Sequence, residues 1–329
     1  MDIGKVPENI LKRSVFKYIH HHRNEITAYP GIGEDCCAID IGEDEILVFS
    51  TDPVTGADKG AGGLAVHINA NDIASSGAEP AGVLVSIIMP PGTEEAYLKE
   101  IMEDISHACD GLGIEIMGGH TEVSGIVNKT VINITCAGKV KRNHFIPAGG
   151  LSAGDEIVMT KWAGLEGTSI IAESKAGILR KSLPERLIEK AVSFKNLISI
   201  VPEAMIAAKN GATAMHDVTE GGIFGALWEI GEASGTGIIA DLRKIPIKQE
   251  TVEICEVFNI NPYMLISSGS LLIGCLHGNQ LVEELNKNGI PAAVIGRAAK
   301  GNNRIIVNGS ETRYLGPAAS DELYKVINV

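Results

Sequence analysis

Acidic side chains recur beside glycines, or where a strand is predicted to end, at five places in the chain. They are Asp35 in GIGEDCC, Asp52 in STD, Asp72 in INANDIASSGAEP, Glu122 in MGGHTEV and Asp217 in MHDVTEGG. A single aspartate beside a glycine is most often a turn residue. Five such places together favour another interpretation, because clustered carboxylates repel one another unless a cation joins them. The natural cation is Mg²⁺, which a few carboxylates hold together with substrate phosphates.

The segment 50–80 combines these acids and several amides with small residues. A helix is predicted over 62–77, and it opens at Gly62-Gly63. The free N–H groups and the positive dipole at such a helix start suit a phosphate. Asp72 lies too deep in the helix to gain from the dipole, and a buried carboxylate without a partner is costly. The pattern therefore predicts that small residues let a phosphate chain come close while acids hold its metal.

Other nucleotide and nucleophile motifs are not supported. GAGGLA at 60–65 fits G-x-G-x-x-A, but the preceding predicted strand ends well before it, and no acid follows at the end of the next strand. The chain has no G-x-x-x-x-G-K-[ST] and no G-x-S-x-G. A dinucleotide fold, a P-loop protein and a nucleophile-elbow hydrolase are therefore disfavoured, and no residue stands out as a catalytic nucleophile or general base.

Composition further restricts the kinds of protein to which the chain can belong. The net charge of −13, from 28 basic and 41 acidic residues, disfavours a nucleic-acid partner, which needs a basic surface. No signal-peptide pattern opens the sequence, and no run approaches the ~18 apolar residues of a membrane span. None of the six cysteines forms a C-x-x-C pair, so reduced thiols are expected. We therefore expect a cytoplasmic protein with no membrane contact.

The elements that must position the acids alternate between strands and helices, which predicts an α/β or α+β fold. The 329 residues suggest two domains, and Pro and Gly at 147–154 place the boundary between 1–150 and 151–329. Strands are predicted at 46–51 (ending at Asp52), 83–89, 130–137, 156–160, 237–241, 270–276 and 292–298, and 211–222 is predicted as a strand that runs into a glycine turn. Besides 62–77, helices are predicted from Thr93 to about Asp110 and at 165–175, 184–209, 223–233 and 279–288.

Taken in order, these motifs resemble the aminoimidazole ribonucleotide (AIR) synthase, or PurM-like, superfamily. Within it the chain is most similar to the hydrogenase-maturation protein HypE and the AIR-synthase-related proteins. The resemblance covers nearly the whole chain. It rests on GEDCCAI (33–39), STDPVT (50–55), NDIASSGAEP (71–80), GGHTEV (118–123), TKWAGLEGTSIIA (160–172), HDVTEGGIFGALWEI (216–230) and NPYMLISSGSLLIG (261–274).

The resemblance implies a fold, ligands and residue roles. The N-terminal α/β domain would bind ATP and Mg²⁺ and pair with its twin into a dimeric β-barrel, and the C-terminal domain would be α+β. The implied metal and phosphate ligands are Asp35, Asp52, Asp72 and Glu122. The implied nucleotide contacts are Gly62, Gly63, Asn71, His120, Thr121, Lys161 and Asp217, with 120–122 in a loop over the phosphates and Lys161 as a charge partner.

The chain also departs from members of the superfamily. HypE carries its carbamoyl group on a terminal cysteine, whereas the last cysteine here, Cys275, lies in a predicted strand. The Cys-Gly-Lys pattern of selenophosphate synthetase is missing near the start of the sequence. His120 stands where HypE and thiamine-monophosphate kinase usually have aspartate.

Three hypotheses follow. The leading one is a cytoplasmic, homodimeric, ATP- and Mg²⁺-dependent enzyme that phosphorylates an oxygen of a small or carbamoyl-type acceptor. The alternative is a non-catalytic nucleotide-binding maturation or scaffold protein, HypE-like, with a partner protein of hydrogenase maturation. The third is a stable two-domain protein whose acids only cap turns.

Overall fold

A computed structural model describes residues 8–16, 23–28, 31–34, 36–42, 44–55, 60–317 and 320–327. Asp35, one of the predicted metal ligands, lies outside the described residues. The chain divides into two compact units, which we call the small unit (23–29 and 35–145) and the large unit (1–22, 30–34 and 146–329). The domain boundary expected from the sequence stays a prediction.

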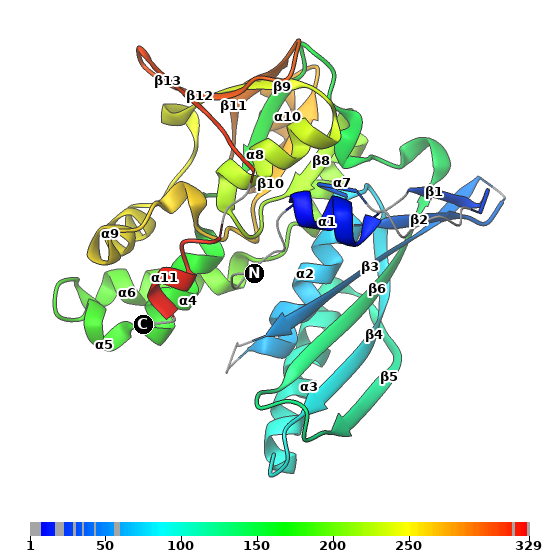
Figure 1. Cartoon of the computed structure of the whole chain (residues 1–329), viewed down its shortest axis with the longest axis vertical. Coiled ribbons are helices and arrows are strands. Elements are labelled where there is room, and N and C mark those ends of the chain that lie inside the picture. The colour runs from blue at the N-terminus through cyan, green and yellow to red at the C-terminus, as the bar shows by residue number, and fades with distance from the viewer. Residues whose placement is uncertain are drawn as a thin grey trace. The chain divides into compact units, whose positions relative to one another are not determined.

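The small unit is a six-stranded sheet with two helices on one face (Figure 1). Its strand order is β1-β2-β3-β6-β4-β5, and only the β4–β5 pair is parallel. The elements are β1 (Ile26–Ala28), β2 (Cys37–Asp40), β3 (Glu45–Thr55), α2 (Ala61–Ser75), β4 (Glu79–Met89), α3 (Glu95–Leu112), β5 (Glu115–Val123) and β6 (Val131–Lys141).

The small residues of α2 allow it to pack closely on α3. A Cβ on Gly62 would lie 2.5 Å from the carbonyl oxygen of Ile101, so only glycine fits there. Farther along α2, Ile73 is fully buried in the core between the sheet and the helices. The low bulk of this segment therefore serves helix packing as well as the site described below.

The opposite face of the small unit's sheet carries a mixture of polar and apolar side chains. Thr51 and Thr135 on neighbouring strands lie 2.9 Å apart, hydroxyl to hydroxyl, and the Asn133 amide donates to the Thr51 hydroxyl at 3.2 Å. Leu84 and Met117 are 46% and 49% exposed. Exposed large apolar side chains on an uncovered sheet face are typical of an interaction surface.

The large unit is a seven-stranded sheet in the order β13-β12-β9-β11-β7-β10-β8, in which only β12 and β9 pair in parallel. Its strands are β7 (Glu156–Thr160), β8 (Ala212–Asp217), β9 (Gly237–Asp241), β10 (Leu271–Cys275), β11 (Ala292–Ala299), β12 (Arg304–Asn308) and β13 (Glu311–Tyr314). Its α-helices are α1 (Glu8–Ser14), α4 (Leu165–Ser174), α5 (Ala176–Leu179), α6 (Glu185–Val192), α7 (Val201–Lys209), α8 (Gly222–Ala233), α9 (Gln249–Phe258), α10 (Gly278–Lys287) and α11 (Tyr324–Ile327).

The mixed α/β class expected from the sequence is confirmed, whereas two element predictions are wrong and several elements were not predicted, among them β1, β2, β5, α9, β12 and β13. The helix expected over 184–209 is broken into α6, the 3₁₀ turn η4 (Ser193–Leu197) and α7, because Pro202 has no N–H to donate to the carbonyl four residues earlier and its ring clashes with that carbonyl. The strand expected to end at Asp52 continues to Thr55. Strand β5, which holds His120 and Glu122, was not predicted, because its sequence lacks an apolar alternation.

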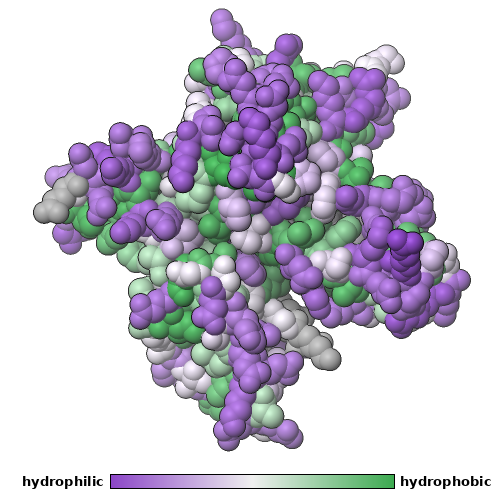
Figure 2. Space-filling model, turned by 180° about the vertical axis from the view of Figure 1, so that it is seen from behind, coloured by the Kyte–Doolittle hydropathy of each residue, from purple (hydrophilic) through white to green (hydrophobic). Residues whose placement is uncertain are grey.

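Among the described residues, no single helix has the length and apolar character to cross a membrane. One pair, Glu185–Leu197 and Val201–Lys209, meets that test together by length and composition only, and the pair is bent by 54° at its break. Figure 2 shows hydrophilic side chains spread over much of the face that it draws.

Candidate functional site

A buried carboxylate lies where α2 contacts β3 in the small unit. Asp72 is 2% exposed, and the hydroxyl of Ser50 on β3 donates a hydrogen bond to its Oδ2. The main-chain carbonyl of Asp72 accepts bonds from the Ser75 hydroxyl at 2.7 Å and the Cys36 thiol at 3.1 Å. These contacts hold Asp72 in place. They also bring Cys36, the residue after Asp35 in sequence, beside α2.

An amide next to this carboxylate holds the backbone of Asp52. Asn69, fully buried on α2, accepts the Asp52 N–H at 2.9 Å and donates to the Asp52 carbonyl at 3.2 Å. The side chain of Asp52 itself is exposed. The sequence analysis selected Asn71, also buried in α2, and missed Asn69. The available signal was the spacing of Asn69 and Asp72, which places them on the same face of a helix.

We call Ser50, Asp52, Asn69 and Asp72 the polar seam. Ser50 and Asp52 are two residues apart on β3 and share one face of the strand. Among the described residues, no group of three His, Cys, Asp or Glu side chains lies close enough to hold a metal ion by itself. Mg²⁺ is usually held by one or two carboxylates plus substrate phosphates, so the two acids of the seam fit a metal that arrives with a nucleotide.

The predicted phosphate contacts Gly62 and Gly63 lie in the first turn of α2. Gly60 caps the helix with φ of 70°, and its carbonyl accepts the N–H of Leu64 at 3.0 Å. The N–H groups before Leu64 therefore belong to the turn that has no helical acceptor. That arrangement is the kind of backbone that binds a phosphate.

The residues His120, Thr121 and Glu122 lie on strand β5, so the expectation that they form a loop is wrong. β5 is the edge strand of its sheet, and all three side chains are exposed. Gly119 lies so close to β4 that a Cβ there would be 1.8 Å from the Val85 carbonyl oxygen, which explains the glycine that precedes them. His120 Nε2 and Glu122 Oε2 are 3.3 Å apart. Their contact with phosphates stays a prediction.

In the large unit, Asp217 is the last residue of β8 and is 1% exposed. His216 beside it pairs with Glu229 of α8, with Nε2 and Oε2 3.1 Å apart. The chain then turns through 218–221 into α8. The strand and glycine turn expected here are confirmed, and the contact of Asp217 with a nucleotide stays a prediction.

A buried acid that the sequence analysis missed, Asp321, binds the backbone of the 218–221 turn. Asp321, 2% exposed, accepts backbone N–H groups from Gly221 at 2.7 Å, Leu323 at 2.8 Å and Ile266 at 3.2 Å. Burial raises the pKa of Asp321 to about 6, although these three donors lower it. No local pattern near position 321 indicates this role, since two of the three donors lie far away in sequence.

Glu166, in the first turn of α4, is another buried acid. It is 3% exposed, and burial raises its pKa to about 7. A hydrogen bond with Ser268 lowers that pKa, and the nearby charge of Asp321 raises it. The region around the 218–221 turn therefore contains two carboxylates that take up protons near neutral pH.

Lys161 is held inside the large unit. Its Nζ lies 2.7 Å from Glu203 Oε1, and it donates to the carbonyls of Leu197 at 2.9 Å and Ser199 at 2.6 Å. Burial lowers the pKa of Lys161, while Glu203 raises it. An ammonium has three N–H donors, so Lys161 would have to release one of these bonds to contact a phosphate.

Comparison with protein families finds two matches along the chain. Residues 33–140 match the N-terminal domain of the AIR synthase related proteins, and residues 152–308 match the C-terminal domain of the same family. These two ranges include the polar seam, the 218–221 turn and Glu166. Asp321 lies beyond the matched ranges.

Two relatives of known name align with most of the chain. A protein named as a hydrogenase expression/formation protein of Methanocaldococcus jannaschii is 29% identical over 318 residues, which cover 92% of this chain and 91% of the relative. A carbamoyl dehydratase HypE of Rhodobacter capsulatus is 28% identical over 234 residues, which cover 69% of this chain and 66% of the relative.

Solved structures share the fold. The HypE–HypF complex contains a chain with a TM-score of 0.78 and 21% identity, over 93% of this chain and 99% of that one. HypE in complex with ATP has a TM-score of 0.68 and 18% identity, over 97% of both chains. ThiL complexed with AMPPCP and TMP has a TM-score of 0.71 and 19% identity, over 95% of this chain and 99% of that one.

Proposed function

The chain belongs to the AIR synthase related protein family, and from this premise we propose that it is an ATP- and Mg²⁺-dependent enzyme. Its reaction would phosphorylate, and so activate, an oxygen of a small or carbamoyl-type acceptor. Support comes from a relative named as a carbamoyl dehydratase and from neighbours in fold that were solved with ATP and with AMPPCP. We assign nucleotide and metal binding, as well as self-association, to the domain 1–150.

The polar seam is the observation that carries this proposal. Asp72 is a buried acid in a helix made largely of small and apolar residues, and Asp52 lies on the adjoining strand. A cation shared by carboxylates on these two adjoining elements would neutralise the charge of both. A role limited to capping turns does not account for Asp72, because its side chain is buried in the last turn of α2 and accepts a hydrogen bond from Ser50 of β3.

The residues of the seam have separate tasks in this proposal. Ser50 fixes the carboxylate of Asp72, and Asn69 fixes the main chain at Asp52. The first-turn N–H groups of α2 would bind phosphate oxygens. Bound with the nucleotide, Mg²⁺ would offset the charge of the β- and γ-phosphates. Lys161 has no part in this scheme, because Glu203 and two carbonyls already bind it.

Isothermal titration of ATP, with Mg²⁺ and without it, tests the proposal. We expect Mg²⁺-dependent binding to the wild type and a loss of at least about tenfold in affinity, or about 1.4 kcal/mol, in Asp72→Asn. Asp110→Asn, at an exposed position of α3, is the matched control and should bind as the wild type does. Equal Mg²⁺-dependent affinity in Asp72→Asn, with its fold verified by circular dichroism, would refute the assignment.

A second candidate is a nucleotide-binding maturation or scaffold protein that acts on a partner. Cys275, the last cysteine in the sequence, is buried in β10, and burial raises the pKa of its thiol to about 11. Such a thiol is a poor nucleophile at neutral pH and would not carry a carbamoyl group. A relative named for hydrogenase expression and formation, and a neighbour in fold solved with HypF, favour this candidate.

Turnover separates the two candidates. Phosphate release that depends on an added small acceptor, such as a carbamoyl compound, supports the enzyme. Tight ATP binding without phosphate release, together with a stoichiometric complex with a HypF-like maturation protein, supports the scaffold.

We also propose that the chain is a homodimer through the uncovered face of the small unit's sheet. Leu84 and Met117 are the exposed apolar side chains on which this rests. Sedimentation velocity should show a dimer for the wild type and a monomer for Leu84→Glu. A wild type that sediments as a monomer at all concentrations would contradict the proposal.

A further inference from the structure

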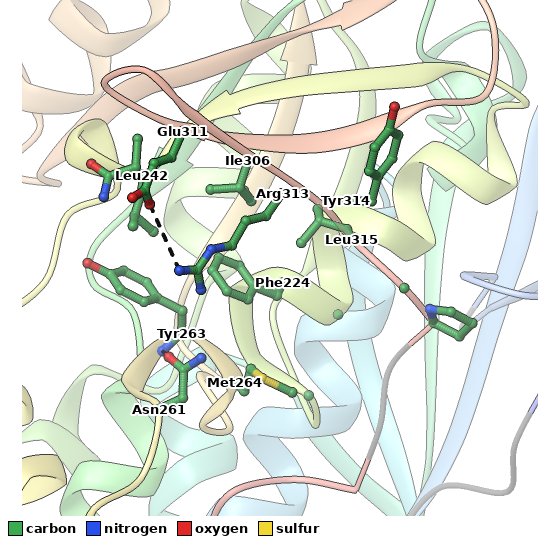
Figure 3. A pocket seen from close by; sticks show the side chains of 15 residues that line it. Phe224, Leu242, Asn261, Tyr263, Met264, Ile306, Glu311, Arg313, Tyr314 and Leu315 are labelled. Carbon is green, nitrogen blue, oxygen red and sulfur yellow. Dashed lines mark hydrogen bonds and ion pairs between the residues drawn. The ribbon is translucent and has the colours of Figure 1, made fainter.

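The large unit contains a cavity that the proposed ATP chemistry does not use. Its volume is about 410 Å³, and residues from α8, β12, β13 and the 3₁₀ turn η6 (Pro262–Met264) line it (Figure 3). Small-molecule sites usually have volumes of about 300–1,000 Å³. The cavity is therefore large enough for a ligand of one or two rings.

Two stacked aromatic rings lie in this cavity. Phe224 of α8 and Tyr263 of η6 stack with their ring centroids 5.4 Å apart and their planes 14° apart. Burial raises the pKa of the Tyr263 hydroxyl. Leu242, Ile306 and Leu315 add apolar walls. Aromatic rings among apolar walls favour a planar, aromatic ligand, which can stack on an exposed ring face.

A cationic side chain points toward these rings. In Figure 3 the guanidinium of Arg313 points into the cavity toward Phe224 and Tyr263, and Tyr314 points away. The ion-pair partner of Arg313 within the described residues is Glu311, two positions away on β13 and 3.9 Å distant. Both side chains are largely exposed, so this pair contributes little to stability. The guanidinium can therefore exchange Glu311 for an anionic ligand at small cost.

The neighbouring arginine of this hairpin is used differently. Arg304 on β12 is buried, lies over the Trp228 ring and pairs with Glu232 at 2.9 Å. Arg304 is therefore held by contacts within the large unit, whereas Arg313 lines the cavity.

We propose that this cavity binds a small planar aromatic anion, with its ring against Phe224 and Tyr263 and its carboxylate or phosphate on Arg313. A guanidinium binds such groups through two parallel N–H bonds. The inference is independent of the proposed function, because it uses no residue of the polar seam and requires no ATP.

Three matched probes test the class of ligand. They are 2-naphthoate, 2-naphthamide (the same rings without the charge) and decalin-2-carboxylate (the same charge without an aromatic ring). We expect 2-naphthoate to bind at least about tenfold more tightly than either relative, a difference of about 1.4 kcal/mol. Binding of 2-naphthoate with Kd above about 1 mM, or no stronger than its two relatives, would overturn the proposal.

The site is verified with methionine labelled by ¹³C at its methyl group. Met264 lines the cavity, whereas Met102 lies on α3 of the small unit. We expect 2-naphthoate to shift the Met264 methyl resonance and to leave that of Met102 unchanged. Binding without a shift of the Met264 resonance would place the ligand elsewhere and overturn the assignment.

Variants separate the roles of charge and ring. Arg313→Gln should weaken 2-naphthoate about tenfold and leave 2-naphthamide unchanged. Phe224→Leu should weaken both probes. Arg186→Gln, at an exposed position of α6, is the control and should change neither. Since Arg313 is exposed on an edge strand, its replacement is not expected to prevent folding. Unchanged affinity of 2-naphthoate for Arg313→Gln would refute the charge contact.

Discussion

The carboxylate of Asp321 accepts the backbone N–H of Gly221 at 2.7 Å, although 100 residues separate the two in sequence. This bond, with those from Ile266 and Leu323, ties the segment before α11 to the turn that follows Asp217 and precedes α8. One carboxylate thus joins three separate parts of the large unit.

Removal of this carboxylate should destabilise the large unit. Asp321→Ala leaves three backbone donors without their acceptor, and we expect a loss of about 2–4 kcal/mol in the free energy of unfolding in urea. Hydrogen exchange should accelerate at Gly221, Ile266 and Leu323. The control Glu283→Ala, at an exposed position of α10, should change stability by less than about 0.5 kcal/mol. Equal stabilities of the two variants would contradict the role of Asp321.

Glu166 should make stability fall as pH rises. Its pKa in the folded state is about 7, above the ordinary glutamate value of 4.5, so the folded state binds more protons than the unfolded state between these values. The stabilisation is complete below pH ~4.5 and is lost as pH rises through about 7. The difference in unfolding free energy between wild type and Glu166→Gln should therefore decrease by about 3 kcal/mol from pH 4 to pH 8.

The measurement for Glu166 is urea denaturation at several pH values. Glu189→Gln, at an exposed position of α6, is the matched control, and its difference from wild type should be constant with pH. A constant difference for Glu166→Gln as well would show that Glu166 has no raised pKa.

Two adjacent glycines of α2 should respond in opposite ways to alanine. The Cβ of Gly62→Ala would lie 2.5 Å from the Ile101 carbonyl oxygen, so we expect a loss of about 2 kcal/mol or more. At Gly63 the nearest atom to a Cβ is the Asp104 carbonyl oxygen at 3.5 Å, an ordinary contact. Gly63→Ala should therefore be neutral or stabilise by up to about 1 kcal/mol. Thermal and urea unfolding measure both, and equal effects would disprove the packing argument.

The buried pair of Lys161 and Glu203 should show strong coupling. Lys161→Met leaves the Glu203 carboxylate buried without its cation and should cost about 3–5 kcal/mol. The double variant Lys161→Met/Glu203→Leu should recover most of that loss, as a double-mutant cycle will show. If the double variant is stable but loses ATP affinity, Lys161 contacts the nucleotide after all.

The six cysteines should differ in reactivity. Burial raises the pKa of Cys109, Cys136, Cys255 and Cys275 to about 11 or 12. The two remaining thiols, at 36 and 37, are partly exposed. Iodoacetamide at pH 8 should therefore add at most two groups to the native protein and six to the denatured control, as intact-mass measurement will show. Rapid addition of more than two groups would mean that the buried strands open readily.

The sequence by itself determined the elements whose patterns are local. β7 and β9 have the bounds that β-branched runs predict, and α4 and α8 differ from prediction by one residue. Runs of apolar residues at strand or helix spacing, bounded by glycine, specify such elements without reference to the rest of the chain. The candidate acids Asp52, Asp72 and Asp217 were selected because their surroundings of small residues and glycine are visible locally, and their contact with a ligand stays a prediction.

Only the tertiary structure decided which of these residues meet. The contact between Ser50 and Asp72, the binding of the Asp52 backbone by Asn69, and the acceptance of the Gly221 N–H by Asp321 all join distant positions. β5 is an edge strand whose side chains are largely exposed. It therefore has no alternation of apolar and polar residues that would predict it. Hydrogen bonds between remote segments depend on the packing of helices on sheets, and no local pattern of residue types encodes that packing.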